Sequence, residues 1–327
     1  MNKSVSTAAC GVALAALLVG CSGTPTAPSD GASDAPTMTI VGGVANEEFY
    51  VTMACGAQEA ADELGVILDV QAGEKWDPAI QTGIVNAIIS AAPDALIIAP
   101  NDRTAMLPPL QAATDAGIKL VVVDTGLDDF SFTASHIASD NVEGAAAAAD
   151  TLAELIGEEG KVLIVGGTPG VTTSEQRTQG FNDAIAQYPN ITVLDQQYTV
   201  NSGVEEAASQ MSAVIAAHPD VAGVFALSLI SGEGVAASLQ QNDLAGKVKV
   251  VAFDAGPGQV EALRNGTLDA LVAQKPREIG RLAVEQALLA INGEETTAEL
   301  RPGFVSLTAD NIDDPENQQW LYKGTCD

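Results

Sequence analysis

The side chains that could do chemistry in this chain are polar and aromatic residues that directly follow short apolar runs rich in Val and Ile. They stand at residues 46–50, 74–77, 100–103, 124–125, 168–177, 198–202, 228–231, 254 and 274. Such side chains can hydrogen-bond to a small polar molecule and stack against it. The set has no GxSxG elbow, no histidine beside any of these positions and no repeated acidic pair, so we expect ligand binding and not an enzyme.

The apolar runs that must position these residues alternate with longer, Ala-rich segments of helical spacing. Eleven runs are expected to be strands: 39–44, 66–71, 95–100, 119–124, 136–139, 161–167, 192–198, 223–228, 249–254, 269–274 and 304–308. Nine segments are expected to be helices: 49–65, 78–92, 104–117, 141–157, 174–187, 203–218, 231–243, 258–266 and 277–293. Leu-Pro-Pro at 107–109 indicates a late start or a kink in the third of them. This alternation predicts parallel sheets covered by helices, in which ligands bind beyond the carboxyl ends of the strands.

The N-terminus has the pattern of an export signal. Lys3 precedes an apolar run that ends near residue 20 and is too short to span a bilayer comfortably, so we expect residues 1–20 to be a signal peptide. The sequence LVGC, which ends at Cys21, resembles the lipobox of bacterial lipoproteins and implies a lipid on that sulfur. The alternative is a plain secretory signal with an incidental Cys21. Residues 21–37 lack large apolar side chains and are expected to form a flexible tether.

Composition excludes several classes of partner. The chain has 14 Lys and Arg against 43 Asp and Glu, a net charge of −29, and no basic cluster that could neutralise phosphates, so nucleic acid is not an expected partner. The two histidines, His136 and His218, stand apart, and no CxxC pair occurs, so neither a metal nor a cofactor is expected.

Two cysteines remain once Cys10 leaves with the signal and Cys21 carries a lipid. Exported proteins meet oxidising conditions, under which two remaining cysteines more often pair than stay free. We therefore predict a disulfide between Cys55 and Cys326 that ties the end of the chain to its first helix; the alternative is two unrelated buried thiols.

Four stretches in a fixed order resemble one protein family. SHIASDN (135–141), HPDVAGVFA (218–226), VVAFDAG (250–256) and ALVAQKPREIG (270–280) are similar to the type I periplasmic binding proteins of the ribose family, which capture sugars for ABC importers. The resemblance runs from residue 39 to about 293. Several ordered matches at matching spacing are more specific than any single motif.

The resemblance implies an α/β fold of two Rossmann-like lobes with parallel sheets, joined by a three-crossing hinge and closing on a sugar. The N-terminal lobe would comprise residues 38–138 and 275–302. The C-terminal lobe would comprise residues 139–274 and 303–327, the last residues returning to the first helix.

The resemblance also implies ligand-binding roles for strand-end residues. Asp124 and Asp254 could each accept two hydroxyl protons, Arg177 could donate to a ring oxygen and a neighbouring hydroxyl, and the Gln274 amide could both donate and accept. For the aspartates the alternative is a helix cap, and for Arg177 a surface position on a helix. The Gly-rich loop 165–177 lacks a nucleotide-binding pattern and is expected to admit Arg177 to the cleft.

Two neighbouring aromatic residues, Phe49 and Tyr50, fall where the family stacks aromatic rings on the apolar face of a sugar. Packing in the core would explain either residue equally well.

The chain departs from the ribose pattern at several polar positions. Glu47, beside Asn46, stands where an asparagine is expected; Asn101 follows Ala-Pro in place of Asn-Pro; and Thr125 and Ser228 replace an arginine and an asparagine. An added carboxylate and a lost arginine favour a neutral, hydroxyl-rich ligand over a sugar acid or sugar phosphate. We therefore expect a monosaccharide or sugar alcohol, without naming it ribose.

The whole pattern predicts a monomeric, extracytoplasmic substrate-binding lipoprotein of an ABC importer. The expected partners are a small sugar or polyol, a membrane permease, and the outer face of the cell membrane through the lipid. The alternative is a sensor that presents its bound ligand to a membrane receptor.

Overall fold

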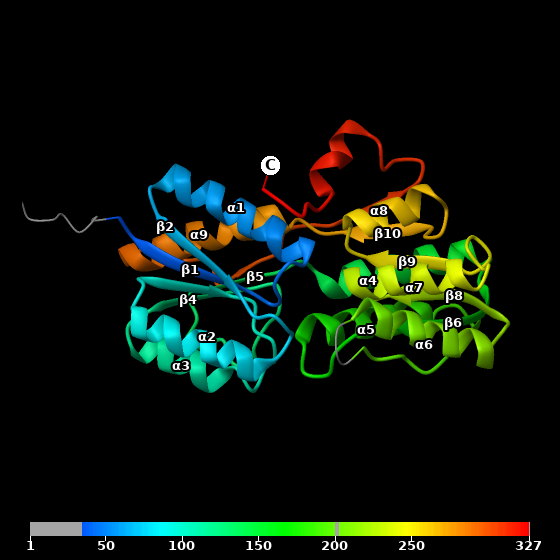
Figure 1. Ribbon diagram of the computed structural model, residues 1–327, viewed down its shortest axis with the longest axis horizontal. Coiled ribbons are helices and arrows are strands. Elements are labelled where there is room, and N and C mark those ends of the chain that lie inside the picture. Colours follow the sequence, from blue (N-terminus) through cyan, green and yellow to red (C-terminus); the bar gives the residue numbers. More distant parts are fainter. Residues whose placement is uncertain (1–34, 200–202, 327) are drawn as a thin grey trace, which may run out of the picture. The chain divides into compact units, whose positions relative to one another are not determined.

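The computed structural model describes residues 35–199 and 203–326, and this part of the chain forms two α/β lobes, each built on a six-stranded sheet (Figure 1). Residues 35–327 group into one compact unit.

The sheet of the first lobe is parallel throughout. Its strands, in spatial order, are β11 (Glu299–Leu300), β5 (Ser135–Ile137), β4 (Lys119–Val123), β3 (Ala95–Ile98), β1 (Thr37–Gly42) and β2 (Ile67–Ala72). Four helices flank it: α1 (Glu48–Leu64) and α9 (Pro276–Asn292) on one face, α2 (Pro78–Ala91) and α3 (Leu107–Asp115) on the other (Figure 1). The central strands are buried from both faces, which explains their continuous Val, Ile and Leu content.

The sheet of the second lobe is parallel except at one edge, where β12 runs antiparallel to β10. Its strands are, in order, β12 (Val305–Thr308), β10 (Ala270–Ala273), β9 (Lys249–Phe253), β8 (Val221–Ala226), β6 (Glu159–Val165) and β7 (Asn190–Val193). Its helices are α4 (Asn141–Leu155), α5 (Thr172–Ile185), α6 (Val204–Ala217), α7 (Leu229–Gln241) and α8 (Pro257–Arg264), and a 3₁₀ helix, η1 (Pro315–Trp320), follows β12.

The chain passes between the lobes three times, at residues 138–140, 274–275 and 301–304. The predicted fold class, two Rossmann-like α/β lobes joined by three crossings, is confirmed. The structure adds β11 to the eleven predicted strands; with two residues it is too short to leave a sequence pattern. Helix α3 begins at Leu107, the late start that its Leu-Pro-Pro sequence predicts, because a helix tolerates proline only in its first turn.

Helices α1 and α9 pack closely through two glycines. A β-carbon at Gly56 would overlap the carbonyl oxygen of Arg277, and one at Gly280 would overlap that of Met53. This contact holds the second and third turns of α1, just after Phe49 and Tyr50, against the first turn of α9.

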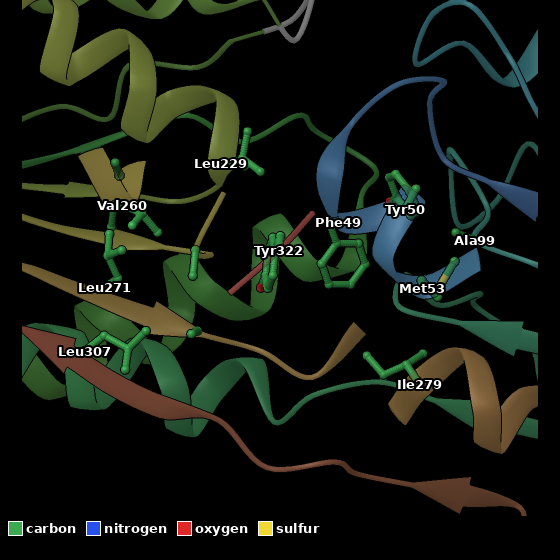
Figure 2. Close-up of a cluster of buried hydrophobic side chains, with 14 of the residues drawn as sticks. Phe49, Tyr50, Met53, Ala99, Leu229, Val260, Leu271, Ile279, Leu307 and Tyr322 are labelled. Atoms are coloured by element: carbon green, nitrogen blue, oxygen red, sulfur yellow. The ribbon is translucent and has the colours of Figure 1, made fainter. Parts of the chain in front are cut away.

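One buried cluster extends across both lobes. Figure 2 shows Phe49 and Met53 of the first lobe on one side of Tyr322, with Leu229 and Leu271 of the second lobe on the other. The hydrophobic core is therefore continuous behind the region where the strands of the two sheets end.

Cys55 on α1 and Cys326 form a disulfide with Cα atoms 5.2 Å apart, the pairing that the sequence predicts. The predicted signal peptide with Cys10, the lipidation site Cys21 and residues 22–34 of the tether lie outside the described residues. Over residues 35–199 and 203–326, none of the helices has both the length and the apolar character needed to cross a membrane.

Candidate functional site

A cavity lies where the carboxyl ends of strands from the two sheets face each other. Both lobes contribute to its lining: Glu47, Phe49, Tyr50, Trp76 and Asp124 from the first, and Gly167, Thr168, Val171, Thr173, Ser174, Arg177, Thr199, Leu227, Ser228, Ile230 and Asp254 from the second, with Gln274 at the second crossing. This is the location that the doubly wound topology favours for a ligand.

Two aspartates occupy equivalent positions in the two lobes. Asp124 follows β4 and its N–H donates to Ile137 O on β5, and Asp254 follows β9 and its N–H donates to Val272 O on β10, both at 2.9 Å. Both have positive φ, 58° and 80°, which is uncommon outside glycine and costs conformational energy. The strained backbone turns both carboxylates into the space between the lobes.

Asp124 forms only one side-chain hydrogen bond in the described structure. It is 7% exposed, and its Oδ2 accepts from the Tyr50 hydroxyl at 2.8 Å. Burial raises its pKa to about 6, a rise that Arg177 and the Tyr50 hydrogen bond oppose and that Asp254 increases. Oδ1 is available to accept from a ligand hydroxyl.

Asp254 is much better satisfied by the protein. It is 3% exposed; its Oδ2 accepts from Leu229 N at 2.8 Å, and its Oδ1 accepts from Gln274 Nε2 at 2.7 Å and from the Tyr322 hydroxyl at 3.0 Å. Nη1 of Arg177 lies 4.0 Å from Oδ2. Asp254 thus organises the second lobe's side of the cavity.

Arg177 is held from several directions. Its Nε donates to Asn141 Oδ1 and its Nη1 to Leu227 O, both at 2.8 Å, and its guanidinium lies 3.9 Å from the ring centroid of Phe253. The side chain is 5% exposed, so the predicted Gly-rich loop does bring this residue into the cavity wall. Nη2 has no hydrogen-bond partner among the described residues, so it can donate to a ligand.

Gln274 supplies an acceptor that has no protein donor among the described residues. The residue is 1% exposed, its Nε2 is bound to Asp254, and its Oε1 is buried without a hydrogen-bond partner. An unsatisfied buried amide oxygen costs about 1–3 kcal/mol. A ligand hydroxyl that donates to Oε1 would remove that cost.

Glu47 precedes α1 but its side chain does not cap the helix. Burial, followed by the repulsion of Asp254, Asp124 and Glu48, raises its pKa to about 8. Glu47 therefore carries a proton at neutral pH and can donate a hydrogen bond.

The cavity contains three aromatic rings, of which sequence reasoning selected two. Phe49 packs edge-on against Tyr50 with ring centroids 5.2 Å apart, and Tyr50 is also committed to Asp124. Trp76 is the third; its Nε1 donates to Asn101 O at 2.9 Å, which orients the indole. Residue 76 lies in one of the flagged strand-end segments, but nothing in the sequence distinguished it there.

Eight of the predicted ligand-binding residues line the cavity: Glu47, Phe49, Tyr50, Asp124, Arg177, Ser228, Asp254 and Gln274. Ser228 is also the N-cap of α7 and accepts from Ser231 N. The other three predicted residues, Asn46, Asn101 and Thr125, are not among the lining residues.

Each of these three is placed elsewhere by local structure. Asn46 is exposed, with φ of 63°, and borders an apolar groove beside β1 and α1. Thr125 is buried and its hydroxyl donates to Pro100 O at 2.7 Å. Asn101 is 3% exposed, and its side-chain amide has no partner in the described structure.

The lobes also touch directly, away from the crossings. Arg103 N donates to Gly170 O at 3.0 Å, the Arg103 guanidinium pairs with Glu175, and Gly126 N donates to Thr172 Oγ1 at 2.6 Å. These contacts join loops after β3 and β4 to the start of α5, and they hold the lobes in contact beside the cavity.

The ionisable groups of the cavity wall are mostly carboxyl groups: Glu47, Asp124 and Asp254 stand against the single arginine Arg177. Among the described residues, no group of His, Cys, Asp and Glu is placed to hold a metal ion. The arrangement can bind a polar, hydroxyl-bearing molecule through acceptors, an arginine and aromatic faces.

Sequence reasoning missed the residues that act on this wall from behind. Asn141 orients Arg177, and Tyr322 contacts Asp254 although it lies near the end of the chain. Thr173, Ser174 and Thr199 fall in the flagged segments, whereas Tyr322 gave no signal because its contact depends on a distant segment folding back.

Comparison with known proteins identifies the family. Residues 38–295 match the model of the periplasmic binding protein domain. The chain is 34% identical over 268 residues to the ribose import binding protein RbsB of Escherichia coli (strain K12), an alignment that covers 80% of this chain and 87% of that protein.

Solved structures show the same architecture. An ABC transporter solute-binding protein from Agrobacterium vitis, bound with α-D-tagatopyranose, is 39% identical with a TM-score of 0.86, and covers 88% of this chain and 99% of its own. A carbohydrate transporter solute-binding protein from Agrobacterium radiobacter, in complex with D-arabinose, is 29% identical with a TM-score of 0.85 and covers 88% and 99%. The lobes, the three crossings and these matches together show that the chain belongs to the periplasmic binding protein domain family.

Proposed function

We propose that this protein is the extracytoplasmic binding component of an ABC importer and that it captures a monosaccharide or sugar alcohol in the cavity between its lobes. One observation carries the proposal. The buried Oε1 of Gln274 has no donor among the described residues, and it lies in a cavity that also presents Asp124, whose carboxylate accepts only from Tyr50 in the described structure. A ligand that offers several hydroxyl donors suits this wall.

The charge balance supports a neutral ligand. A carboxylate or phosphate on the ligand would lie near Asp124 and Asp254, and Arg177 already donates to Asn141 and Leu227. Removing an anion from water to such a site is costly without a dedicated cation. The relatives whose names or structures mention ribose, tagatose and arabinose are consistent with this ligand class.

The test is thermal unfolding of residues 35–327 with D-ribose, D-tagatose, D-arabinose, D-allose, pentitols, hexitols and inositols. A ligand that binds the folded state raises the midpoint, and the free energy of unfolding increases by about 2.7 kcal/mol at 100 times the Kd. We expect one stereochemical series to raise the midpoint and its terminal phosphate or uronic acid forms to have no effect. If sugar acids raise it and neutral sugars do not, the proposal is wrong.

We infer import and not sensing, because curated relatives are named import binding proteins. The permease is then the membrane partner, and the protein acts as a monomer. Deleting the gene should abolish uptake of the radiolabelled ligand; uptake that continues while a transcriptional response to the sugar disappears would favour the sensor.

We also propose that Cys21 carries the lipid that anchors the protein to the outer face of the cell membrane. The support is the LVGC sequence and the short apolar run before it. Labelling cells with a fatty acid should mark the wild-type protein but not Cys21→Ser, which should appear in the medium. Equal labelling of both proteins would contradict the anchor.

A further inference from the structure

The end of the chain crosses from the second lobe back to the first. We call residues 315–326 the C-terminal strap; it begins with η1 above the second lobe and ends beside α1 (Figure 1). Contacts to both lobes hold it: Tyr322 N donates to Ala255 O at 3.0 Å, Lys323 N donates to Thr52 Oγ1 at 2.8 Å, and Cys326 is bonded to Cys55. The strap thus adds a covalent connection between the lobes, beyond the three crossings.

Tyr322 of the strap lies directly behind the cavity wall. It is 4% exposed, and its ring meets that of Phe49 with centroids 5.7 Å apart at 69°. Figure 2 shows the ring between Phe49 and the side chains of the second lobe. Tyr322 does not itself line the cavity, so it can affect a ligand only through the residues that do.

The Tyr322 hydroxyl joins two of those lining residues. It accepts from Gln274 N at 3.1 Å and donates to Asp254 Oδ1 at 3.0 Å. Because the phenol has a single proton and its oxygen faces an N–H donor, that proton points to Asp254. The same Oδ1 accepts from Gln274 Nε2 at 2.7 Å, so the backbone and side chain of Gln274 are both held, through Tyr322 and Asp254.

The environment keeps this hydroxyl protonated. Burial, followed by the charge of Asp254, raises the pKa of Tyr322 well above its usual value. The donor to Asp254 is therefore present throughout the pH range in which the protein would work.

We propose that Tyr322 is a positioning residue for the ligand: it fixes Asp254 and directs Oε1 of Gln274 toward the cavity, and the Cys55–Cys326 disulfide holds it in place. The effect on affinity rests on the proposed function. The effect on Asp254 and Gln274 does not, because both hydrogen bonds exist without a ligand.

The decisive variant is Tyr322→Phe, which removes the hydroxyl and keeps the ring on Phe49. Its matched control is Tyr188→Phe, which removes a hydroxyl that donates to Asp150 Oδ1 at 3.0 Å on the surface of the second lobe. Both are made in residues 35–327 and compared by isothermal titration calorimetry with D-ribose, D-tagatose, D-arabinose and D-allose. We expect an affinity about tenfold lower for Y322F, the equivalent of one hydrogen bond to a charged group, and wild-type affinity for Y188F.

A measurement without ligand separates positioning from general loosening. In Y322F the backbone N–H of Gln274 loses its acceptor, the Tyr322 hydroxyl. The backbone N–H of Leu229 keeps its acceptor, Asp254, but Asp254 is held less firmly. Both amides should therefore exchange with deuterium about tenfold faster or more. Amides at the centre of β8, such as Val224, should exchange as in the wild type. Equal acceleration throughout the second lobe would show that Tyr322 only fills the core and would overturn the proposal.

The disulfide is tested by a cycle of variants. The double change Cys55→Ser and Cys326→Ser should lower affinity in the wild-type protein but add little in Y322F, because the disulfide acts through Tyr322. If the cysteine changes lower affinity by the same factor in the wild type and in Y322F, the disulfide does not act through Tyr322, and that part of the proposal is wrong. If no sugar of the panel binds the wild type, the proposed function fails, while unchanged exchange at Gln274 and Leu229 in Y322F would still overturn the positioning role.

Discussion

The two lobes present equivalent aspartates to the cavity, but the two carboxylates differ in how many protein groups donate hydrogen bonds to them. Asp254 accepts from three protein donors, one of them Tyr322 of the strap, whereas Asp124 accepts only from Tyr50 among the described residues. Both follow a central strand and both have positive φ. Their difference therefore arises from what packs behind them and not from the strands that carry them.

The comparison suggests a division of labour between the lobes. The second lobe's wall is preorganised, since its donors are already aligned and a ligand need not order them. The first lobe's wall is incompletely satisfied: Asp124 and Glu47 are carboxyl groups whose pKa values are raised, to about 6 and about 8. A ligand that donates to Asp124 favours the charged form and gains most from that wall.

The largest effect is expected for Asp254→Asn. Both oxygens of Asp254 accept hydrogen bonds, so in the asparagine the NH₂ must face another donor, either Leu229 N or the groups of Gln274 and Tyr322. We expect at least about 100-fold weaker binding by calorimetry and a free energy of unfolding lower by about 2–4 kcal/mol in urea. Unchanged stability would mean that the second wall is not held as described.

Asp124→Asn should have the opposite effect on stability and raise the free energy of unfolding at pH 7. The raised pKa means that the stabilising neutral form is fully present below about pH 4 and is lost as pH rises through about 6. The amide avoids that loss and can still accept from Tyr50, so at pH 7 ligand-free D124N should be about 1–3 kcal/mol more stable than the wild type. Its affinity should fall about tenfold. A destabilised D124N at pH 7 would contradict the contrast between the walls.

Glu47→Gln tests the first lobe's wall through the pH dependence of stability, over a higher pH range than Asp124→Asn. Because burial raises the pKa of Glu47 to about 8, wild-type stability should decline as pH rises from about 4.5 through 8, relative to E47Q. Glu47 is only partly buried, so the difference at pH 9 should be roughly 1–2 kcal/mol. Parallel pH profiles for the two proteins between pH 4 and 9 would show that this carboxyl ionises normally.

The smallest effect is expected at the contact between the lobes beside the cavity. Arg103 pairs with Asp128 in its own lobe and with Glu175 in the other, and the three side chains are 40–45% exposed. Exposed ion pairs contribute about 0–1 kcal/mol, so Arg103→Ala should lower affinity less than about fivefold, mainly through faster dissociation. Arg264→Ala, which breaks the exposed pair with Asp313 within one lobe, is the matched control. A loss as large as that of Asp254→Asn would place Arg103 in the ligand site.

Much of the fold was predictable because local patterns repeat. Alternating Val- and Ile-rich runs and Ala-rich helices are set by burial on both faces of a parallel sheet, and all nine predicted helices are present. The exception is β11, which has only two residues and therefore no period that a sequence can display.

The site was predictable where a strand delivers a residue directly. Asp124, Asp254 and Gln274 follow buried strands, so their position at the sheet edge follows from chain order alone. Thr125 was misjudged because the next residue along points to the opposite side, where its hydroxyl finds Pro100 O. Trp76 stood in a flagged loop, but loop backbones set side-chain direction individually.

By itself, the sequence determined the alternation of strands and helices, the strand-end carboxylates, the paired cysteines and the acidic surface, because each depends on neighbours along the chain or on composition. Only the tertiary structure decided which carboxylate is satisfied. Tyr322 reaches Asp254 across 68 positions of the sequence, and Lys323 reaches Thr52 across 271. Such contacts depend on how separate elements pack in space, and packing leaves no period in the sequence.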